Sequence, residues 1–313
     1  MAEKIVAALG GNALQARHAD PTAEAQLEIV KRTVRQLAAI SGRGTELAVV
    51  HGNGPQVGRL LLALETAAET VPPLPVDVCG AMSQGYIGYH IQQALAAELR
   101  RQGREVPVVT LATQVVVDRN DPAFQNPDKP IGPFYSRAQA SILEKDKGYT
   151  MAEDAGRGWR RVVPSPEPRR IVELECVKRL WDHAIVIACG GGGIPVAETA
   201  DGGLEGVAAV IDKDRSAGLL AEELGADRLL ILTEVEKAAI RFGKPNQQDL
   251  DHLTVVEAEQ YAEAGEFGRG SMLPKIRAAM HFAASAPGRQ AVISSLDRAL
   301  DALDGKTGTC ISA

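Results

Sequence analysis

Three short apolar runs in this chain each end in glycine. The runs at residues 5–9, 47–51 and 185–189 continue into Gly10-Gly11-Asn12, Gly52-Asn53-Gly54 and Gly190-Gly191-Gly192-Gly193. A run of this length bounded by glycine is typical of a buried strand in a parallel sheet. Glycine beyond the strand lets backbone N–H groups approach a ligand without an intervening Cβ. A single glycine after a strand is common in turns without a binding role, but three such turns together favour an anion site, such as one for phosphate.

Helical periodicity alternates with strands over most of the chain. Helices are predicted from Asp20-Pro21 to Ser41-Gly42 and at 56–68, 81–101, 170–181, 214–224, 255–264 and 272–284, and further strands at 106–111, 113–117, 229–232, 291–294 and 309–311. This alternation predicts an α/β fold with a mostly parallel sheet covered on both faces. Residues 118–161 lose the regular period, so we expect an inserted subdomain or lid there, followed by an extended crossing through Pro164, Pro166 and Pro168.

Length and charge narrow the possible partners. The chain has 313 residues, enough for one large α/β domain or two lobes. Its 34 Lys and Arg against 40 Asp and Glu give a net charge of −6, and only 4% of residues are aromatic. An acidic surface poor in aromatic rings argues against binding nucleic acid or anionic membranes. No segment approaches the roughly 18 to 20 apolar residues of a membrane span, so a cytoplasmic protein is expected.

Metal and nucleophile motifs do not stand out. The four cysteines form no C-x-x-C pair and the six histidines no H-E-x-x-H motif, so no metal held by protein side chains is expected. His51 beside Gly52 is interpreted as a packed turn residue rather than a catalyst. Neither the Walker A motif nor the dinucleotide-binding glycine motif fits the glycine turns, so any phosphate chemistry must use other groups.

Two lysines lie where a helix disfavours them. Lys213 precedes the predicted helix at 214–224, and Lys275 follows Ser271 and Pro274 in the first turn of another helix. A helix N-terminus is already positive, so a cation there is unfavourable unless an anion binds nearby. Asp214 could cap its helix, hold two ammonium groups, or do both. Solvated surface lysines remain the alternative interpretation.

Two further lysines lie in loops rich in proline and glycine. Lys129 belongs to Asn126-Pro127-Asp128-Lys129-Pro130-Ile131-Gly132-Pro133, and Lys244 to Phe242-Gly243-Lys244-Pro245. A stiff loop can aim a side chain at a ligand, although a lysine in such a loop is more often solvated surface.

Taken in order, these segments resemble the carbamate kinases of the amino acid kinase superfamily. Nine ordered blocks carry the resemblance: residues 8–14, 51–58, 77–85, 126–134, 160–166, 190–196, 210–214, 242–245 and 270–275. The resemblance implies an open αβα sandwich, usually a homodimer. It also implies an acceptor lobe at 1–165 that includes a lid at about 119–162, and a nucleotide lobe at 166–313.

The resemblance also implies roles for individual residues. Lys129, Lys213 and Lys275 would surround the transferring phosphoryl group, and Asp214 would organise the lysines. Backbone and amide groups of one set would bind phosphate or carbamate: Gly10, Gly11, Asn12, Gly52, Asn53, Gly54, Gly191 and Gly192. A second set would lie near ATP or ADP: Thr233, Phe242, Lys244 and Met272. Mg²⁺ would bridge the nucleotide phosphates, mostly through phosphate and water oxygens.

The implied reaction transfers a phosphoryl group between ATP and carbamate, in either direction. Carbamate is already an anionic nucleophile, so no general base is required, and cationic groups must suppress repulsion between the reactants. A sister kinase for another acidic acceptor is one alternative, which the segment around Lys129 argues against. A nucleotide-binding regulator without activity is another, which the presence of Lys213, Asp214 and Lys275 argues against.

Overall fold

An eight-stranded sheet forms the centre of the molecule. The computed structural model describes residues 2–11, 14, 22–154, 156–268 and 270–313. In sheet order the strands are β15 (His252–Thr254), β17 (Thr309–Ser312), β16 (Gln290–Ser295), β12 (Arg228–Thr233), β1 (Lys4–Leu9), β2 (Glu46–His51), β9 (Ile185–Ile187) and β3 (Val108–Thr110). The pairs from β16 to β3 are parallel, whereas β17 is antiparallel to β16. The predicted mostly parallel sheet is therefore confirmed.

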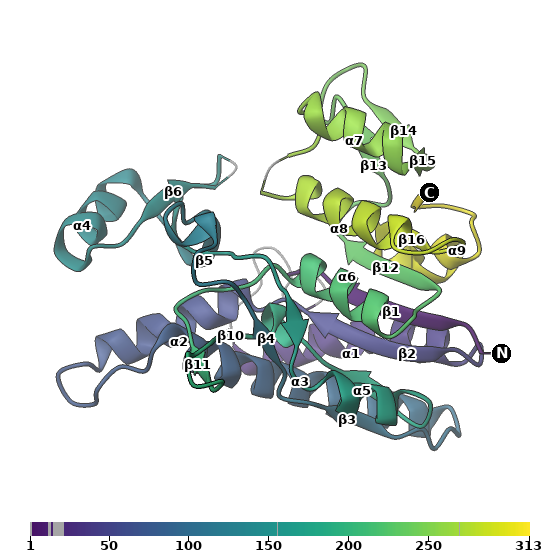
Figure 1. The fold of residues 1–313 in the computed structure, drawn as a ribbon, viewed down its shortest axis with the longest axis horizontal. Coiled ribbons are helices and arrows are strands. Elements are labelled where there is room, and N and C mark those ends of the chain that lie inside the picture. Colours follow the sequence, from purple (N-terminus) through teal and green to yellow (C-terminus); the bar gives the residue numbers. More distant parts are fainter. Residues whose placement is uncertain (1, 12–13, 15–21, 155, 269) are drawn as a thin grey trace.

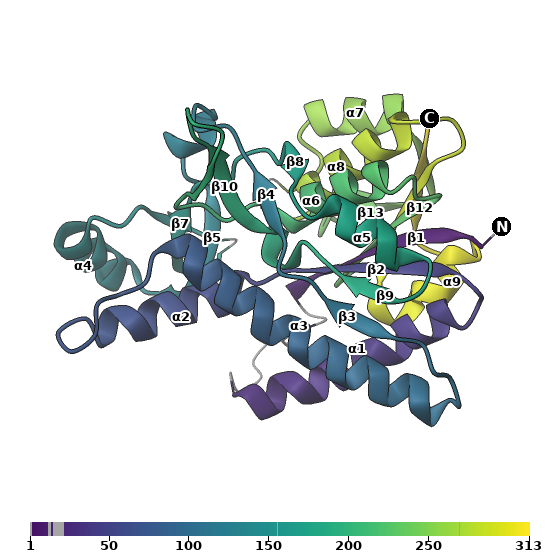
Figure 2. The same cartoon turned by 60° about the horizontal axis from the view of Figure 1, so that its bottom comes forward.

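Helices cover both faces of this sheet, as Figure 2 shows. Side chains of β1 alternate between the faces: Val6 and Ala8 pack toward one, and Ile5, Ala7 and Leu9 toward the other. The first face is covered by α5 (Leu174–Trp181), α6 (Lys213–Glu223), α7 (Val255–Glu263) and α8 (Met272–Ala284), and the second by α1 (Ala23–Ser41), α3 (Val76–Arg101) and α9 (Ala299–Leu303). Strands buried on both faces read as continuous apolar runs, which explains the sequence pattern. The fold is the αβα sandwich that was expected.

Smaller sheets flank the central one. β4 (Gln114–Val116), β8 (Arg170–Ile171), β10 (Ile194–Glu198) and β11 (Leu204–Gly206) form a four-stranded sheet, and β13 (Ala238–Ile240) pairs with β14 (Gln248–Leu250). The helix predicted at 170–181 begins only at Leu174, because residues 170–171 pair with β4. Pro168 favours extended backbone before it, and the chain stays extended into this strand. The predicted helix start at Asp20-Pro21 lies outside the described residues.

The segment predicted to be a lid, which we call the lid, is more regular than its sequence indicates. β5 (Lys129–Tyr135), β7 (Trp159–Val163) and β6 (Met151–Glu153) form an antiparallel sheet, accompanied by α4 (Arg137–Lys147). The prediction of a loop around Lys129 was wrong, because Lys129 begins the strand β5. Pro130 and Pro133 lie in β5, an edge strand, where a missing N–H costs no ladder hydrogen bond. In Figure 1 the lid projects from the sandwich beside α2 (Gly54–Thr66). None of the described helices combines the length and apolar character needed to cross a bilayer.

Candidate active site

The glycine turns meet at one edge of the central sheet. β12, β1, β2 and β9 are adjacent parallel strands, so their carboxyl ends lie side by side. The Gly10 N–H donates to the carbonyl of Leu232 over 2.9 Å, and the Gly52 N–H donates to the carbonyl of Leu9 over 3.2 Å. Thr233 ends β12 next to Gly10. Ligands of open α/β sheets bind at this carboxyl edge, so the edge is the candidate site.

The turn after β9 is closely packed. Gly191 (φ 70°) and Gly192 (φ 93°) have left-handed backbone conformations that favour glycine. A Cβ on Gly191 would lie 2.2 Å from Nδ2 of Asn53, and a Cβ on Gly192 would lie 2.2 Å from the carbonyl oxygen of Ile211. These glycines therefore allow the turn to fit between the Gly52–Gly54 turn and the chain entering α6.

A carboxylate holds two buried lysines at this edge. Lys213, the first residue of α6, places its Nζ 2.6 Å from Oδ1 of Asp214. Lys275, in the first turn of α8, places its Nζ 2.9 Å from the other oxygen, Oδ2. The Asp214 side chain is 2% exposed, and the two lysines are 11% and 14% exposed. The stem of Lys213 packs against Gly52, since a Cβ added there would lie 3.1 Å from its Cδ. Two helix starts and a glycine turn thus share one site.

Burial and mutual attraction set the protonation of this cluster. Burial by itself raises the pKa of Asp214, but Lys213 and Lys275 outweigh it, so the pKa lies below its ordinary value. Burial lowers the pKa of Lys213, and Asp214 opposes this only in part. For Lys275, burial also lowers the pKa, but attraction to Asp214 dominates and raises it. Asp214 is therefore ionised at neutral pH and keeps positive charge beside the glycine turns.

Asp212 is a member of the site that the sequence analysis missed. Its Oδ1 accepts hydrogen bonds from the backbone N–H of Asp214 (2.8 Å) and of Arg215 (3.4 Å), so Asp212, and not Asp214, is the N-cap of α6. Its Oδ2 forms an ion pair with Lys129 of the lid. Burial raises the pKa of Asp212, but Lys129 and Lys213 together bring it far below the ordinary value. An Asp two residues before the predicted helix at 214–224 was the available signal, because Asp is a favoured N-cap.

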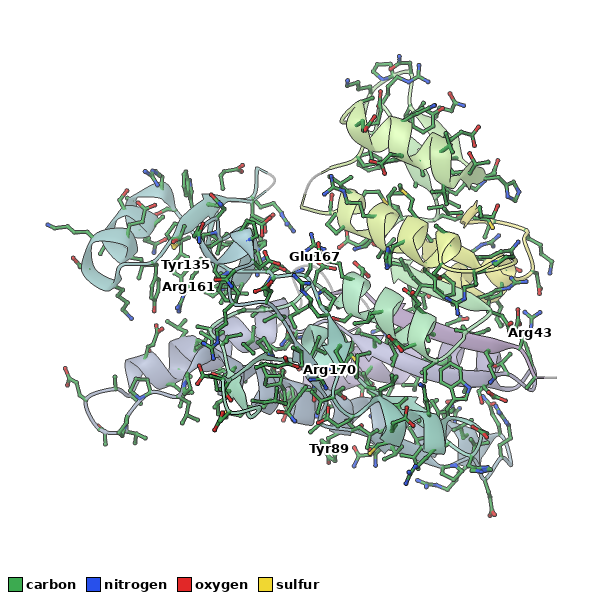
Figure 3. All side chains as sticks on the ribbon, in the orientation of Figure 1. Arg43, Tyr89, Tyr135, Arg161, Glu167 and Arg170 are labelled. Atoms are coloured by element: carbon green, nitrogen blue, oxygen red, sulfur yellow. The ribbon has the colours of Figure 1, made fainter. Side chains whose placement is uncertain are left out.

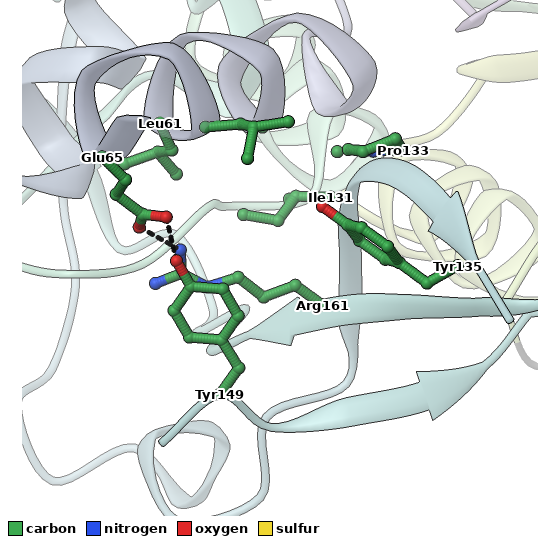
Figure 4. A pocket seen from close by; sticks show the side chains of 10 residues that line it. Leu61, Glu65, Ile131, Pro133, Tyr135, Tyr149 and Arg161 are labelled. Atoms are coloured by element: carbon green, nitrogen blue, oxygen red, sulfur yellow. Dashed lines mark hydrogen bonds and ion pairs between the residues drawn. The ribbon is translucent and has the colours of Figure 1, made fainter. Parts of the chain in front are cut away.

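The lid rests on α2. Figure 4 shows Glu65 of α2 facing Arg161 and Tyr149 of the lid: a carboxylate oxygen lies 3.0 Å from Nη1 of Arg161, and the Tyr149 hydroxyl donates to the other oxygen. Beside this contact the backbones meet closely, because a Cβ on Gly58 would lie 2.1 Å from backbone atoms of Gly132. These contacts place β5, and with it Lys129, against the start of α2.

The chain leaving the lid is held at α6. Figure 3 shows Tyr135 and Arg161 on the lid and Glu167 where the chain returns to the sandwich. Arg215 of α6 forms an ion pair with Glu167 over 2.9 Å and donates to the carbonyl of Ser165 over 3.3 Å. The lid is therefore connected to the helix that carries Lys213.

The other predicted residues lie on several elements. Gly11 follows Gly10, Gly54 begins α2, and Met272 begins α8, three residues before Lys275. Phe242 and Lys244 lie in the exposed turn between β13 and β14. Asn12 lies outside the described residues. Within the described ranges, no group of three or more His, Cys, Asp or Glu side chains is placed to hold a metal ion.

His51 is a structural residue, as the sequence predicted. Its side chain is fully buried, and burial lowers its pKa to about 4. The ring is therefore neutral at pH 7. Its Nδ1 lies 3.0 Å from the carbonyl oxygen of Gly52 and donates to it, because a carbonyl can only accept.

Comparison with known proteins places this arrangement in a family. The sequence pattern of the amino acid kinase family matches residues 3–294. The chain is 53% identical to the carbamate kinase of Clostridium perfringens, over 98% of this chain and 99% of that one. It is 51% identical to the carbamate kinase of Pyrococcus horikoshii over the full length of both. The structure of carbamate kinase from Giardia lamblia bound to citric acid has a TM-score of 0.95 and 41% identity, covering 99% of this chain and 98% of that chain. The chain belongs to the amino acid kinase family and, within it, to the carbamate kinases.

Proposed function

We propose that this enzyme catalyses reversible phosphoryl transfer between ATP and carbamate, in which ADP and carbamoyl phosphate give ATP and carbamate. One observation carries the proposal: two buried lysines lie 2.6 and 2.9 Å from a single buried carboxylate, at the sheet edge where the glycine turns meet. Phosphoryl transfer depends on positioning and on positive charge around the transferred group, and needs little covalent help from the protein.

The proposed mechanism uses charge stabilisation rather than a general base. The carbamate oxygen attacks the γ-phosphorus of ATP in line with the leaving ADP oxygen. Lys213 and Lys275 stabilise the charge on the transferring group, and Asp214 fixes their ammonium groups before the substrates bind. Lys129, paired with Asp212 here, exchanges this partner for a phosphoryl oxygen when substrate is present. Backbone N–H groups of Gly11, Asn53 and Gly54, with the turn at 191–192, bind the acceptor. The N–H groups of Gly10 and Gly52 are already paired with the carbonyls of Leu232 and Leu9, so these two glycines hold the turns against the strand ends and do not donate to the acceptor.

The nucleotide is proposed to bind as its magnesium complex. Asp212 and Asp214 are already paired with lysines, so Mg²⁺ would be bound mainly through the nucleotide and water and would neutralise part of the phosphate charge. We assign residues 166–313 to nucleotide binding, with Thr233, Phe242, Lys244 and Met272 near the nucleotide, and residues 1–165 with the lid to the acceptor. A carbamate kinase from Giardia lamblia has been solved with AMP-PNP at 41% identity to this chain, which supports a nucleotide site. From the family resemblance we further propose a homodimer that works in the cytoplasm.

The test is an assay of ATP formation by the purified protein with Mg²⁺, ADP and carbamoyl phosphate. We expect turnover with carbamoyl phosphate, and a loss of at least about a hundredfold in kcat for Lys213→Ala, the cost of removing one charge-stabilising group. Acetyl phosphate and other acyl phosphates serve as competing substrates in the same assay. Turnover of one of these with none of carbamoyl phosphate would refute the assigned acceptor, and full activity of Lys213→Ala would remove that lysine from the mechanism.

A further inference from the structure

Two polar side chains of α3 reach the glycine turns from the face of the central sheet opposite α6. Ser83 and Gln84 are 0% and 1% exposed and lie in a segment, residues 77–85, that has no part in the proposed mechanism. Polar groups buried this completely are costly unless they are fully hydrogen-bonded. Their partners therefore indicate what the two side chains are for.

Gln84 joins two loops with one amide. Its Oε1 accepts from the backbone N–H of Thr113 over 2.7 Å, and its Nε2 donates to the carbonyl of Gly190 over 2.8 Å and to that of Thr113 over 3.3 Å. Thr113 is itself fully buried and directly precedes β4 of the four-stranded sheet. Its carbonyl also accepts the N–H of Ile194 over 2.8 Å. The amide of Gln84 thus fixes both ends of the turn that follows β9.

The turn that follows β9 lies between the Gly52–Gly54 turn and α6. Gly191 packs against the side chain of Asn53, and the carbonyl of Gly192 accepts the hydroxyl of Ser216 over 2.7 Å. Ser216 lies on α6, one turn beyond Lys213. A shift of the turn therefore changes the spacing between the Gly52–Gly54 turn and the lysine that packs on it.

Ser83 fixes the other side of the same arrangement. The Nδ2 of Asn53 donates to its hydroxyl over 2.8 Å, and the hydroxyl donates to the carbonyl of Gly80 over 2.7 Å. The carboxamide of Asn53 is thereby directed toward α3. Both glycine turns are thus attached to neighbouring residues of one rigid helix.

We propose that Gln84 is a positioning residue of the phosphoryl-transfer site, which holds the Gly190–Gly192 turn, and through it the Gly52–Gly54 turn and the start of α6, in the arrangement that binds the anionic acceptor. Gln84 reaches no reacting atom itself and acts through the backbone it holds. The inference rests on the proposed function, because it assigns these turns to the acceptor.

The test compares Gln84→Met with a matched control on the same helix. Gln92 also lies on α3 and also accepts a backbone N–H from the adjoining segment, that of Thr110 over 2.8 Å, but has no bond to the glycine turn. In Gln84→Met the KM for carbamoyl phosphate should rise about tenfold, equal to about 1.4 kcal/mol, while the KM for ADP stays within about twofold. Gln92→Met should lower the midpoint of thermal unfolding and leave both KM values unchanged.

Gln84→Glu provides a readout that general destabilisation would not produce. A protonated Glu has an acceptor for the N–H of Thr113 and one O–H donor for the carbonyl of Gly190, so it loses only the longer bond that the amide makes to the carbonyl of Thr113, whereas a carboxylate would repel the carbonyl of Gly190. Burial raises the pKa of such a carboxyl, so it becomes protonated as the pH is lowered. The ratio of the KM of Gln84→Glu for carbamoyl phosphate to that of the parent enzyme should therefore fall between about pH 8.5 and about pH 6.

Several results would overturn the inference. These are an unchanged KM for carbamoyl phosphate in Gln84→Met, an equal rise for both substrates, or a Gln84→Glu enzyme whose relative KM does not depend on pH. If Gln84→Met does not fold, the pH dependence of Gln84→Glu decides. Failure of the proposed function is separate, because it appears as no turnover of carbamoyl phosphate by the parent enzyme.

Discussion

Replacing Asp214 by asparagine tests the electrostatic basis of the site most directly. The substitution keeps the shape of the side chain and removes the charge that two ammonium groups share at 2.6 and 2.9 Å. At an effective dielectric constant of about 20, each of these contacts contributes about 6 kcal/mol of Coulomb attraction before desolvation is subtracted. Removing one partner from a buried ionic cluster typically costs about 3–5 kcal/mol, because the remaining charges lose their compensation.

Two consequences are expected for Asp214→Asn. The kcat for ATP formation should fall by about a hundredfold or more, since Lys213 and Lys275 repel each other and no longer hold their positions. The pKa of Lys213, already lowered by burial, should fall further. A lysine whose pKa is lower in the folded than in the unfolded state stabilises the fold increasingly as the pH rises. The variant should therefore gain stability toward alkaline pH more steeply than the parent enzyme.

The assay is ATP formation from ADP and carbamoyl phosphate, combined with urea unfolding between about pH 7 and pH 9. Asp301→Asn is the matched control: Asp301 also contacts two cations, Arg298 at 3.3 Å and Lys306 at 3.7 Å, but its side chain is 37% exposed on α9. An exposed pair contributes at most about 1 kcal/mol, so this variant should keep the parent kcat. The reasoning is refuted if Asp214→Asn keeps kcat within about threefold of the parent enzyme, or loses no more than the control.

Two further predictions concern stability and the lid. His51 has a pKa of about 4 in the fold, against an ordinary value of 6.5, so stability should fall by up to about 3 kcal/mol as the pH drops from about 6.5 to about 4, where the unfolded chain takes up the proton. His51→Gln should show a smaller loss in urea unfolding over the same window, and an identical pH dependence would contradict the assignment. Gly58→Ala should lower kcat by about tenfold, because its Cβ would meet the backbone of Gly132 and displace the strand that carries Lys129. Gly85→Ala is the control, because Gly85 lies at an exposed helical position with open space around it. Equal activity of the two variants would show that the contact between the lid and α2 does not affect catalysis.

Local patterns predicted most of the sandwich because its strands are buried on both faces. The helix predicted at 272–284 has these bounds in the structure, and the runs that end at Leu9 and His51 are the strands β1 and β2. The errors fall where neighbours outside the local window decide the conformation. Residues 170–171 pair with β4, and the proline-containing strand β5 persists because it lies at a sheet edge.

The candidate site was predictable in its residue types but not in its pairings. Lys213 and Lys275 were identified because a cation at a helix start breaks a local rule. Asp212 was missed as a partner because its ion pair with Lys129 joins residues 83 positions apart. The amide of Gln84 reaches Gly190 across 106 positions, and no local pattern announces such a contact.

The sequence alone determined most strands of the central sheet, where glycine follows a strand, and which helix starts carry lysine, because these depend on interactions within a few residues. The tertiary structure decided the rest. Sheet order placed β12, β1, β2 and β9 side by side, and the packing of α6 on α8 placed two lysines on one carboxylate. Convergence of this kind depends on how distant segments pack, since each charge lowers its energy only when a partner far along the chain is brought within reach.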